Sequence, residues 1–362
     1  MKILHKGQIS APLQGKLNYN AWGSVITLSG GEMMAVWSGD RLAHICPFGQ
    51  VLASRSADGG YTWAPPYPVL RTPLDDRDAG LCQAIGGQLL LTSFNNSRDR
   101  QRFYAERGKY PEPKRAFVES YLNTVSDEEE RRYLGAVVAV SRDGGFTFTE
   151  PQPMPITSPH GPLALSDGSF LWIGRSFSDS APASFPYLGE GIYAMRLSDG
   201  GEMIGEPWLI VPKCAEEGTL FCEPHAAIMP DGSILCAIRV QNYTAGRSLF
   251  TVYLCRSTDG GVTFSEPIAT GWDGSPPHML VTKSGAVIMT YARRRAPFAE
   301  CARVSYDSGL TWSEEIVLDD TAPNGDIGYP CTAENGRGEL VTIYYQNDPG
   351  LGSQIRSIIW EV

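Results

Sequence analysis

The stretch SRDGGFTF at residues 141–148 decides the fold, because close copies occur elsewhere in the chain: SADGGYTW at 56–63, STDGGVTF at 257–264 and SYDSGLTW at 305–312. A weaker copy, DGG at 199–201, precedes Glu206-Pro207. Each copy predicts a hairpin turn, because an aspartate side chain accepts hydrogen bonds from backbone N–H groups of its own turn and glycine tolerates positive φ. The aromatic residue is expected to pack under the next strand. Four good copies indicate a repeated structural unit.

A second repeat surrounds the first. Six apolar segments are each interrupted by a glycine-containing turn, at residues 22–37, 81–94, 162–175, 224–239, 277–293 and 330–345. Each segment predicts two strands around a tight turn, followed by a third strand. The aspartate motif then joins this third strand to a fourth. The sequence therefore predicts an all-β, six-bladed β-propeller that forms a single domain over residues 1–362, and five or seven blades fit the spacing less well.

The fourth strand of the last unit is expected to come from the N-terminal end of the sequence. Residues 355–360 are its third strand, and no fourth strand follows them in the sequence. Residues 2–9 are the candidate for that fourth strand, because pairing the two ends would close the ring and cover an exposed sheet edge.

Residues 98–135 interrupt the repeating pattern of strands and turns in blade 2 with a charged segment of helical character. The segment from Pro113 to Val118 predicts a helix start, and Ser126-Asp127-Glu128-Glu129 resembles a capping box. An insertion of this length is expected to form a pocket wall or lid, or to pack against a second subunit.

Composition excludes several classes of protein. The chain has 362 residues with a formal net charge of −10 and no basic stripe, which argues against a nucleic-acid partner. No apolar run approaches the length of a membrane span, and the first residues lack the apolar core of a signal peptide. The eight cysteines are scattered without a Cys-x-x-Cys pair, so we expect reduced thiols, a cytoplasmic protein and no thiol-held metal. No cofactor is expected, and the oligomeric state stays open.

Propeller topology brings one set of residues to a single mouth. The innermost strand of each blade starts at the face to which the second strand returns. First-strand starts contribute Trp22, Asp78, His160, Glu223, His225, His278, Asp326 and Tyr329, and second-strand ends contribute Asp40, Arg175, Arg239, Arg293 and Arg294. Arginines, histidines, a tyrosine and carboxylates at a concave mouth predict a functional site.

The repeats resemble the Asp-boxes of sialidase-like β-propellers, in which these hairpins are structural. The segment Phe221-Cys222-Glu223-Pro224, followed by Arg239, is similar to that family's glutamate-to-arginine segment, and the segment Asp326 to Pro330 is similar to the one that carries its tyrosine nucleophile. The resemblance implies that Tyr329 is the nucleophile or a stabiliser, Glu223 its base and Arg239 a carboxylate clamp. Asp40 or Asp78 would be the acid. Sialidases use a tyrosine where most glycosidases use a second carboxylate.

The chain departs from the family at the arginines that hold sialic acid. Ala21-Trp22-Gly23 replaces the Arg-Ile-Pro of the first blade, and the third arginine of the family's triad is not in its usual place, although Arg293 and Arg294 lie near it. We therefore expect a glycoside hydrolase that acts on a terminal acidic sugar other than sialic acid.

Two alternatives stay open. One is a polysaccharide lyase that uses histidine and tyrosine on uronate-containing glycans, with His160, His225 and His278 as its histidines and a metal-assisted variant. The other is a carbohydrate-binding propeller without catalysis.

Overall fold

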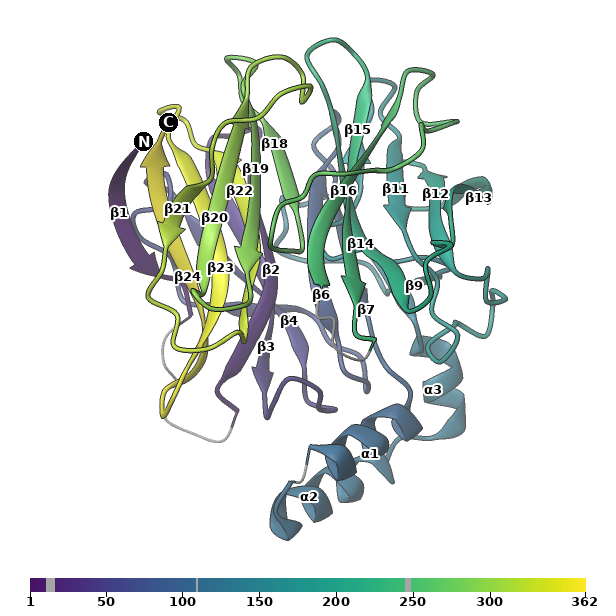
Figure 1. The fold of residues 1–362 in the computed structure, drawn as a ribbon. Coiled ribbons are helices and arrows are strands. Elements are labelled where there is room, and N and C mark those ends of the chain that lie inside the picture. Colours follow the sequence, from purple (N-terminus) through teal and green to yellow (C-terminus); the bar gives the residue numbers. More distant parts are fainter. Residues whose placement is uncertain (11–16, 109, 245–248) are drawn as a thin grey trace.

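The computed structural model describes residues 1–10, 17–108, 110–244 and 249–362. Antiparallel strands build the sheets of an all-β propeller, in which most strands are hydrogen-bonded to a sequence neighbour, and one helical segment projects from one end of it (Figure 1). Short strands separated by tight turns produce this architecture, because each strand can bury its apolar residues only against a neighbouring sheet. None of the helices in the described residues has the length and apolar character needed to span a membrane.

The strands follow the six sequence repeats. The first three units comprise β2 (Tyr19–Thr27), β3 (Met33–Arg41), β4 (Gln50–Ser56), β5 (Tyr67–Leu70); β6 (Arg77–Gln83), β7 (Leu89–Phe94), β8 (Ala136–Ser141), β9 (Gln152–Met154); and β10 (Leu163–Ala164), β11 (Phe170–Gly174), β12 (Gly191–Leu197), β13 (Met203–Pro212). The others comprise β14 (Thr219–Ile228), β15 (Ile234–Asn242), β16 (Leu249–Ser257), β17 (Ile268–Ala269); β18 (His278–Val281), β19 (Val287–Arg293), β20 (Ala299–Ser305), β21 (Ile316–Asp319); and β22 (Ile327–Glu334), β23 (Leu340–Asp348), β24 (Gly352–Glu361), with β1 (Lys2–Gln8).

The number of separate blades differs from the prediction. Units 2 to 5 form four separate four-stranded sheets, whereas the first and last units run together into one eight-stranded sheet. A parallel bridge between Tyr19 and Ser353 joins β2 to β24. Ser353 N–H also donates to Asn18 O over 3.0 Å, and Asn20 Nδ2 donates to Ser353 O over 3.2 Å. The prediction of six separate blades is therefore wrong, because these contacts fuse the sheets on either side of the ring closure.

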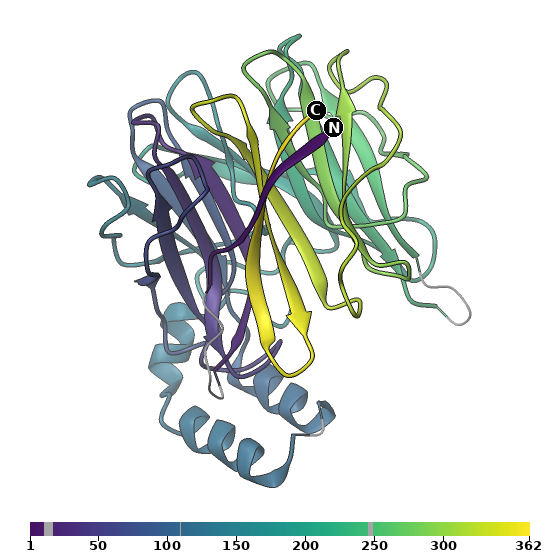
Figure 2. The same ribbon diagram turned by 90° about the vertical axis from the view of Figure 1, so that its left-hand side faces the viewer.

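The predicted closing strand is confirmed. Strand β1 pairs antiparallel with β24, from Lys2 opposite Glu361 to Gln8 opposite Arg356. Both chain ends consequently lie side by side at the end of the molecule opposite the helices (Figure 2). The edge of β24 is covered by a strand drawn from the other end of the sequence.

The aspartate hairpins connect third to fourth strands and make the predicted hydrogen bonds. In the hairpin between β16 and β17, Thr263 N–H donates to Asp259 Oδ1 over 3.0 Å, and Asp259 also accepts from the Thr263 hydroxyl over 2.6 Å. Ser257 Oγ accepts from Gly261 N–H over 2.9 Å. Asp58, Asp143 and Asp307 accept from the equivalent threonines. Each hairpin thereby provides hydrogen-bond acceptors for the backbone N–H groups of its own exposed turn.

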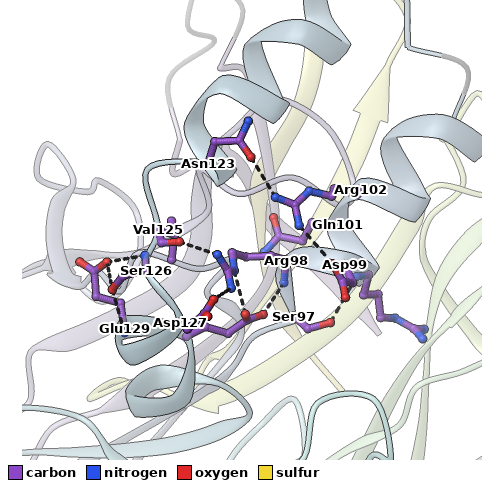
Figure 3. A network of polar contacts seen from close by, with 12 residues as sticks. Ser97, Arg98, Asp99, Gln101, Arg102, Asn123, Val125, Ser126, Asp127 and Glu129 are labelled. Atoms are coloured by element: carbon purple, nitrogen blue, oxygen red, sulfur yellow. Dashed lines mark hydrogen bonds and ion pairs between the residues drawn. The ribbon is translucent and has the colours of Figure 1, made fainter.

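The insertion between β7 and β8 is helical, as predicted. It contains α1 (Arg98–Arg107), α2 (Glu112–Leu122) and α3 (Asp127–Tyr133), and the capping box between Ser126 and Glu129 is present. Figure 3 shows how two arginines of α1 hold the three helices together. Arg98 donates to Val125 O over 2.6 Å and forms an ion pair with Asp127, whereas Arg102 Nη2 donates to Asn123 Oδ1 over 3.1 Å.

Candidate active site

A backbone irregularity recurs at the start of the innermost strands. In β2, β6, β14 and β22 the pairing with the second strand shifts register, and the residue at each shift has positive φ: Trp22 52°, Asp78 49°, Glu223 45° and Tyr329 54°. Positive φ is costly for any residue with a Cβ, and bulges of this kind re-aim side chains beside active sites. The fold thus imposes one strained conformation at four equivalent positions around its axis.

Three side chains from distant parts of the chain meet at this level. The Tyr329 hydroxyl donates to Glu223 Oε1 over 2.7 Å. Arg239 Nη1, from β15, lies 2.5 Å from Glu223 Oε2 and 3.1 Å from the Tyr329 oxygen. A phenol, its hydrogen-bond acceptor and a cation therefore form one closed triangle, and Tyr329 and Arg239 are almost fully buried.

The electrostatics of this triangle keep the phenol protonated at rest. Burial raises the pKa of Tyr329 well above its usual value, and the Glu223 carboxylate raises it further, whereas Arg239 lowers it. The Arg294 guanidinium carbon lies 5.9 Å from the Tyr329 ring centroid and also favours the phenolate. The arrangement can hold a phenol beside a proton acceptor and stabilise its anion with two cations.

Asp78 provides a different kind of carboxyl. It is buried at the start of β6. Burial raises its pKa to about 7, against the opposing effect of Arg77 and with a further upward contribution from Glu223. A substantial fraction of Asp78 is therefore protonated near neutral pH. Such a carboxyl can deliver a proton to a leaving group.

These residues line one concave cavity of about 430 Å³, here called the mouth cavity. Five arginines line it: Arg77, Arg100, Arg175, Arg239 and Arg294. Aromatic rings from Phe94, Phe177, Tyr243 and Phe250 add apolar surface. A cavity of this size with few carboxylates and many guanidinium groups suits a small anionic ligand.

Two of these arginines have no carboxylate partner among the described residues, whereas Arg239 pairs with Glu223 and Arg100 with Asp179. Arg294 donates to Gly325 O over 3.2 Å and contacts the Tyr345 hydroxyl at 3.4 Å. The guanidinium carbon of Arg175 lies 4.5 Å from the Phe177 ring centroid. Both are positioned to bind an anion that enters the mouth cavity.

The structure brings together six of the residues predicted for the mouth: Tyr329, Glu223, Asp78, Arg239, Arg175 and Arg294. Other predicted residues lie outside the lining. Asp40 accepts from Gln50 over 2.6 Å, and Arg293 is paired with Glu315 at 2.6 Å. Trp22 is buried beneath two guanidinium groups, with its ring centroid 4.0 Å from the Arg77 carbon. Asp326 accepts from the hydroxyls of Tyr19 and Tyr345 over 2.9 and 3.0 Å.

The three predicted histidines occupy a different place. His160, His225 and His278 line a second cavity that opens at the other end of the propeller axis. The innermost strand runs along the axis, so a residue two positions after the bulge lies about 6–7 Å deeper. His225 follows Glu223 in this way and lies below the floor of the mouth cavity. Within the described residues no group of His, Cys, Asp or Glu has the geometry of a metal site.

The sequence-based prediction omits several residues of the mouth cavity. His44, in the loop after β3, lines it, and its Nδ1 lies 2.8 Å from the Tyr19 hydroxyl. Arg100 and Tyr104 enter it from α1, where Arg100 Nη2 donates to the Tyr104 hydroxyl over 3.0 Å. The four-residue spacing of Arg100 and Tyr104 on a helix was the available signal. The insertion therefore supplies part of the pocket wall.

Comparison with solved structures identifies the fold. A protein of unknown function from Dyadobacter fermentans superposes with a TM-score of 0.73 at 20% identity over 99% of this chain and 98% of its own. The α-L-arabinanase of Penicillium chrysogenum gives 0.69 at 14% identity over 100% and 99%, and the intramolecular trans-sialidase of Ruminococcus gnavus gives 0.61 at 14% over 95% of both chains. The chain therefore has the β-propeller fold of sialidases and arabinanases. Neither protein-family models nor curated protein sequences yield a match.

Proposed function

We propose that residues 1–362 form a single-domain glycoside hydrolase that acts on a terminal acidic sugar through a tyrosine nucleophile. The observation that carries the proposal is the triangle of Tyr329, Glu223 and Arg239, in which the phenol donates to the carboxylate over 2.7 Å. A phenol is a poor nucleophile until it is ionised, so a carboxylate within hydrogen-bond reach has an evident role. The sialidase and arabinanase neighbours share the fold of this chain and support a glycoside hydrolase.

In the first step, Glu223 accepts the phenolic proton while the Tyr329 oxygen attacks the anomeric carbon. The bond from that carbon to the leaving-group oxygen breaks, and Asp78 protonates this oxygen. In the second step, the Asp78 carboxylate takes a proton from water as the water oxygen attacks the anomeric carbon. The phenolate leaves and recovers its proton from Glu223. The net reaction consumes one water, and two displacements at one carbon retain its configuration.

Anion recognition is assigned to Arg175 and Arg294, together with Arg239. An acidic sugar would find two guanidinium groups without carboxylate partners in the described part of the chain. Charge-assisted contacts of this kind are about twice as strong as neutral hydrogen bonds. The substrate's carboxylate is thus held on the side of the cavity formed by units 3 to 5.

The proposal is tested with two panels of aryl glycosides, acidic and neutral, on the wild-type protein and on Tyr329→Phe. We expect turnover of at least one acidic glycoside, and its loss in the variant. Turnover confined to neutral glycosides would contradict the acidic substrate. Saturable binding of acidic sugars without turnover would favour a carbohydrate-binding propeller.

A further inference from the structure

The face opposite the mouth carries a second cavity, of about 760 Å³, here called the rear cavity. Its lining comes from the hairpins between first and second strands and shares no residue with the mouth cavity. The walls are mostly apolar and include Val25, Leu81, Leu163, Ala226 and Met279. Lys283 and Glu334 lie at its rim, where Lys283 N–H donates to Glu334 Oε2 over 2.7 Å.

The rear cavity ends on three histidine rings. His160, His225 and His278 come from consecutive sequence units, and their ring centroids lie 4.3–5.7 Å apart. Burial lowers the pKa of His160 to about 3 and that of His225 and His278 well below the usual value. All three imidazoles are therefore neutral at physiological pH.

The backbone of the next unit fixes the tautomer of two rings. Met279 N–H donates to His225 Nδ1 over 3.0 Å, and Thr332 N–H donates to His278 Nδ1 over 3.3 Å. A backbone amide can only donate, so both Nδ1 atoms carry lone pairs and both protons reside on Nε2. The Nε2–H bonds point to the opposite side of each ring. A metal ion needs a lone pair on the ligating nitrogen, and these two Nε2 atoms have none.

His160 completes the cluster with an unpaired nitrogen. Its Nδ1 lies 3.4 Å from Ser24 Oγ, and its Nε2 is buried without a hydrogen-bond partner in the described part of the chain. A buried polar nitrogen without a partner calls for an explanation, such as a ligand. The floor thus offers the Nε2–H donors of His225 and His278, and His160 adds a third when Ser24 Oγ donates to its Nδ1, while the described residues supply no acceptor for them.

We propose that the rear cavity is a second binding site, for a small carboxylate with an apolar body, whose oxygens accept from the Nε2–H groups of His225, His278 and His160. The apolar walls would cover the body of the ligand, and the histidine floor would supply the donors that a carboxylate needs after it leaves water. This site is independent of the chemistry at the mouth cavity.

The test compares hexanoate with 1-hexanol at pH 7, where hexanoate is ionised. Calorimetry on the wild-type protein should show hexanoate binding about tenfold or more tighter than hexanol, since a charged hydrogen bond contributes that much. Histidine ring ¹⁵N resonances should shift on addition of hexanoate. His160→Leu should weaken hexanoate binding by about tenfold, and within the described part of the chain His160 is hydrogen-bonded to the Ser24 side chain and not to the backbone.

The mouth cavity also contains arginines, so Arg294→Met is the matched control and should leave hexanoate affinity unchanged. Loss of binding in Arg294→Met with retention in His160→Leu would overturn the proposal. Equal affinities for hexanoate and hexanol, absence of binding by either, or binding of one Zn²⁺ that His160→Leu abolishes would overturn it too. Unshifted histidine resonances in the wild-type protein decide against it even if His160→Leu does not fold.

Discussion

Tyr329 and Glu223 lie 106 residues apart in the chain and 2.7 Å apart in space. Replacing Tyr329 with phenylalanine removes the oxygen that donates its proton to the Glu223 carboxylate and that, in the proposed mechanism, attacks the substrate. We expect kcat to fall on the order of 10²-fold or more while KM changes little, because the lost interaction belongs to the transition state. Steady-state kinetics on an acidic aryl glycoside measures both constants.

The matched control is Tyr253→Phe on β16, which removes a hydroxyl in the same unit as Glu223 but outside the mouth cavity. It should retain wild-type kcat. Full activity in Tyr329→Phe, or equal losses of activity in the two variants, would refute the assignment of Tyr329 as the nucleophile.

In the proposed mechanism, Asp78 sets the pH dependence of turnover. Because its pKa is raised to about 7, the protonated form that acts as an acid predominates below pH 7 and disappears above it. We therefore expect kcat/KM to fall as the pH rises through about 7. In Asp78→Asn this fall in kcat/KM with rising pH should vanish. The variant should also lose far more turnover of glycosides with poor leaving groups than of glycosides with good ones. A pH limb that persists in Asp78→Asn would exclude Asp78 as the acid.

The aspartate hairpins should act on stability alone. Hydrogen bonds to Thr263 and Ser257 lower the pKa of Asp259 to about 2, below its unfolded value of about 4. A depressed carboxyl pKa stabilises the folded state above pH 4, and this contribution is lost as the pH falls through 2. Asp259→Ala should therefore lower Tm at pH 7, and the difference from wild type should shrink toward pH 2. A constant difference across this range would show that the turn hydrogen bonds do not carry the effect.

Strands and hairpins could be predicted from the sequence because they depend on local chemistry. Apolar alternation, glycine turns and the aspartate motif each act within about a dozen residues, and the capping box of α3 is equally local. Burial depth is not local. His225 and Glu223 lie two residues apart on β14, yet they line cavities at opposite ends of the axis. The positive φ that aims Glu223 at the mouth depends on pairing with β15, and no glycine or asparagine marks it.

The insertion, too, has features that local sequence patterns could not predict. Its helices were predictable, and a pocket wall was one of the two roles expected of it, but the residues that enter the mouth cavity were not predictable, because the position of α1 depends on contacts with α2 and α3. Arg98 and Arg102 make those contacts through Asp127 and Asn123 (Figure 3). They place Arg100 and Tyr104 in the wall of a cavity built mainly from strands.

Strand β1 is expected to stabilise the closed ring. Its residues cover the edge of β24, and Lys6 Nζ lies 3.1 Å from Asp319 Oδ1 of the neighbouring unit. Deletion of residues 1–9 would expose the unpaired N–H and C=O groups of β24 at the point where the first and last units meet. We expect a lower Tm and concentration-dependent aggregation, measured by thermal unfolding and light scattering. Lys6→Gln is the control, since it removes the ion pair but keeps the strand, and it should remain soluble with a Tm near wild type. A deletion variant that stays monomeric with an unchanged Tm would show that the ring closes without β1, and that the contacts of Ser353 with Asn18 and Asn20 suffice.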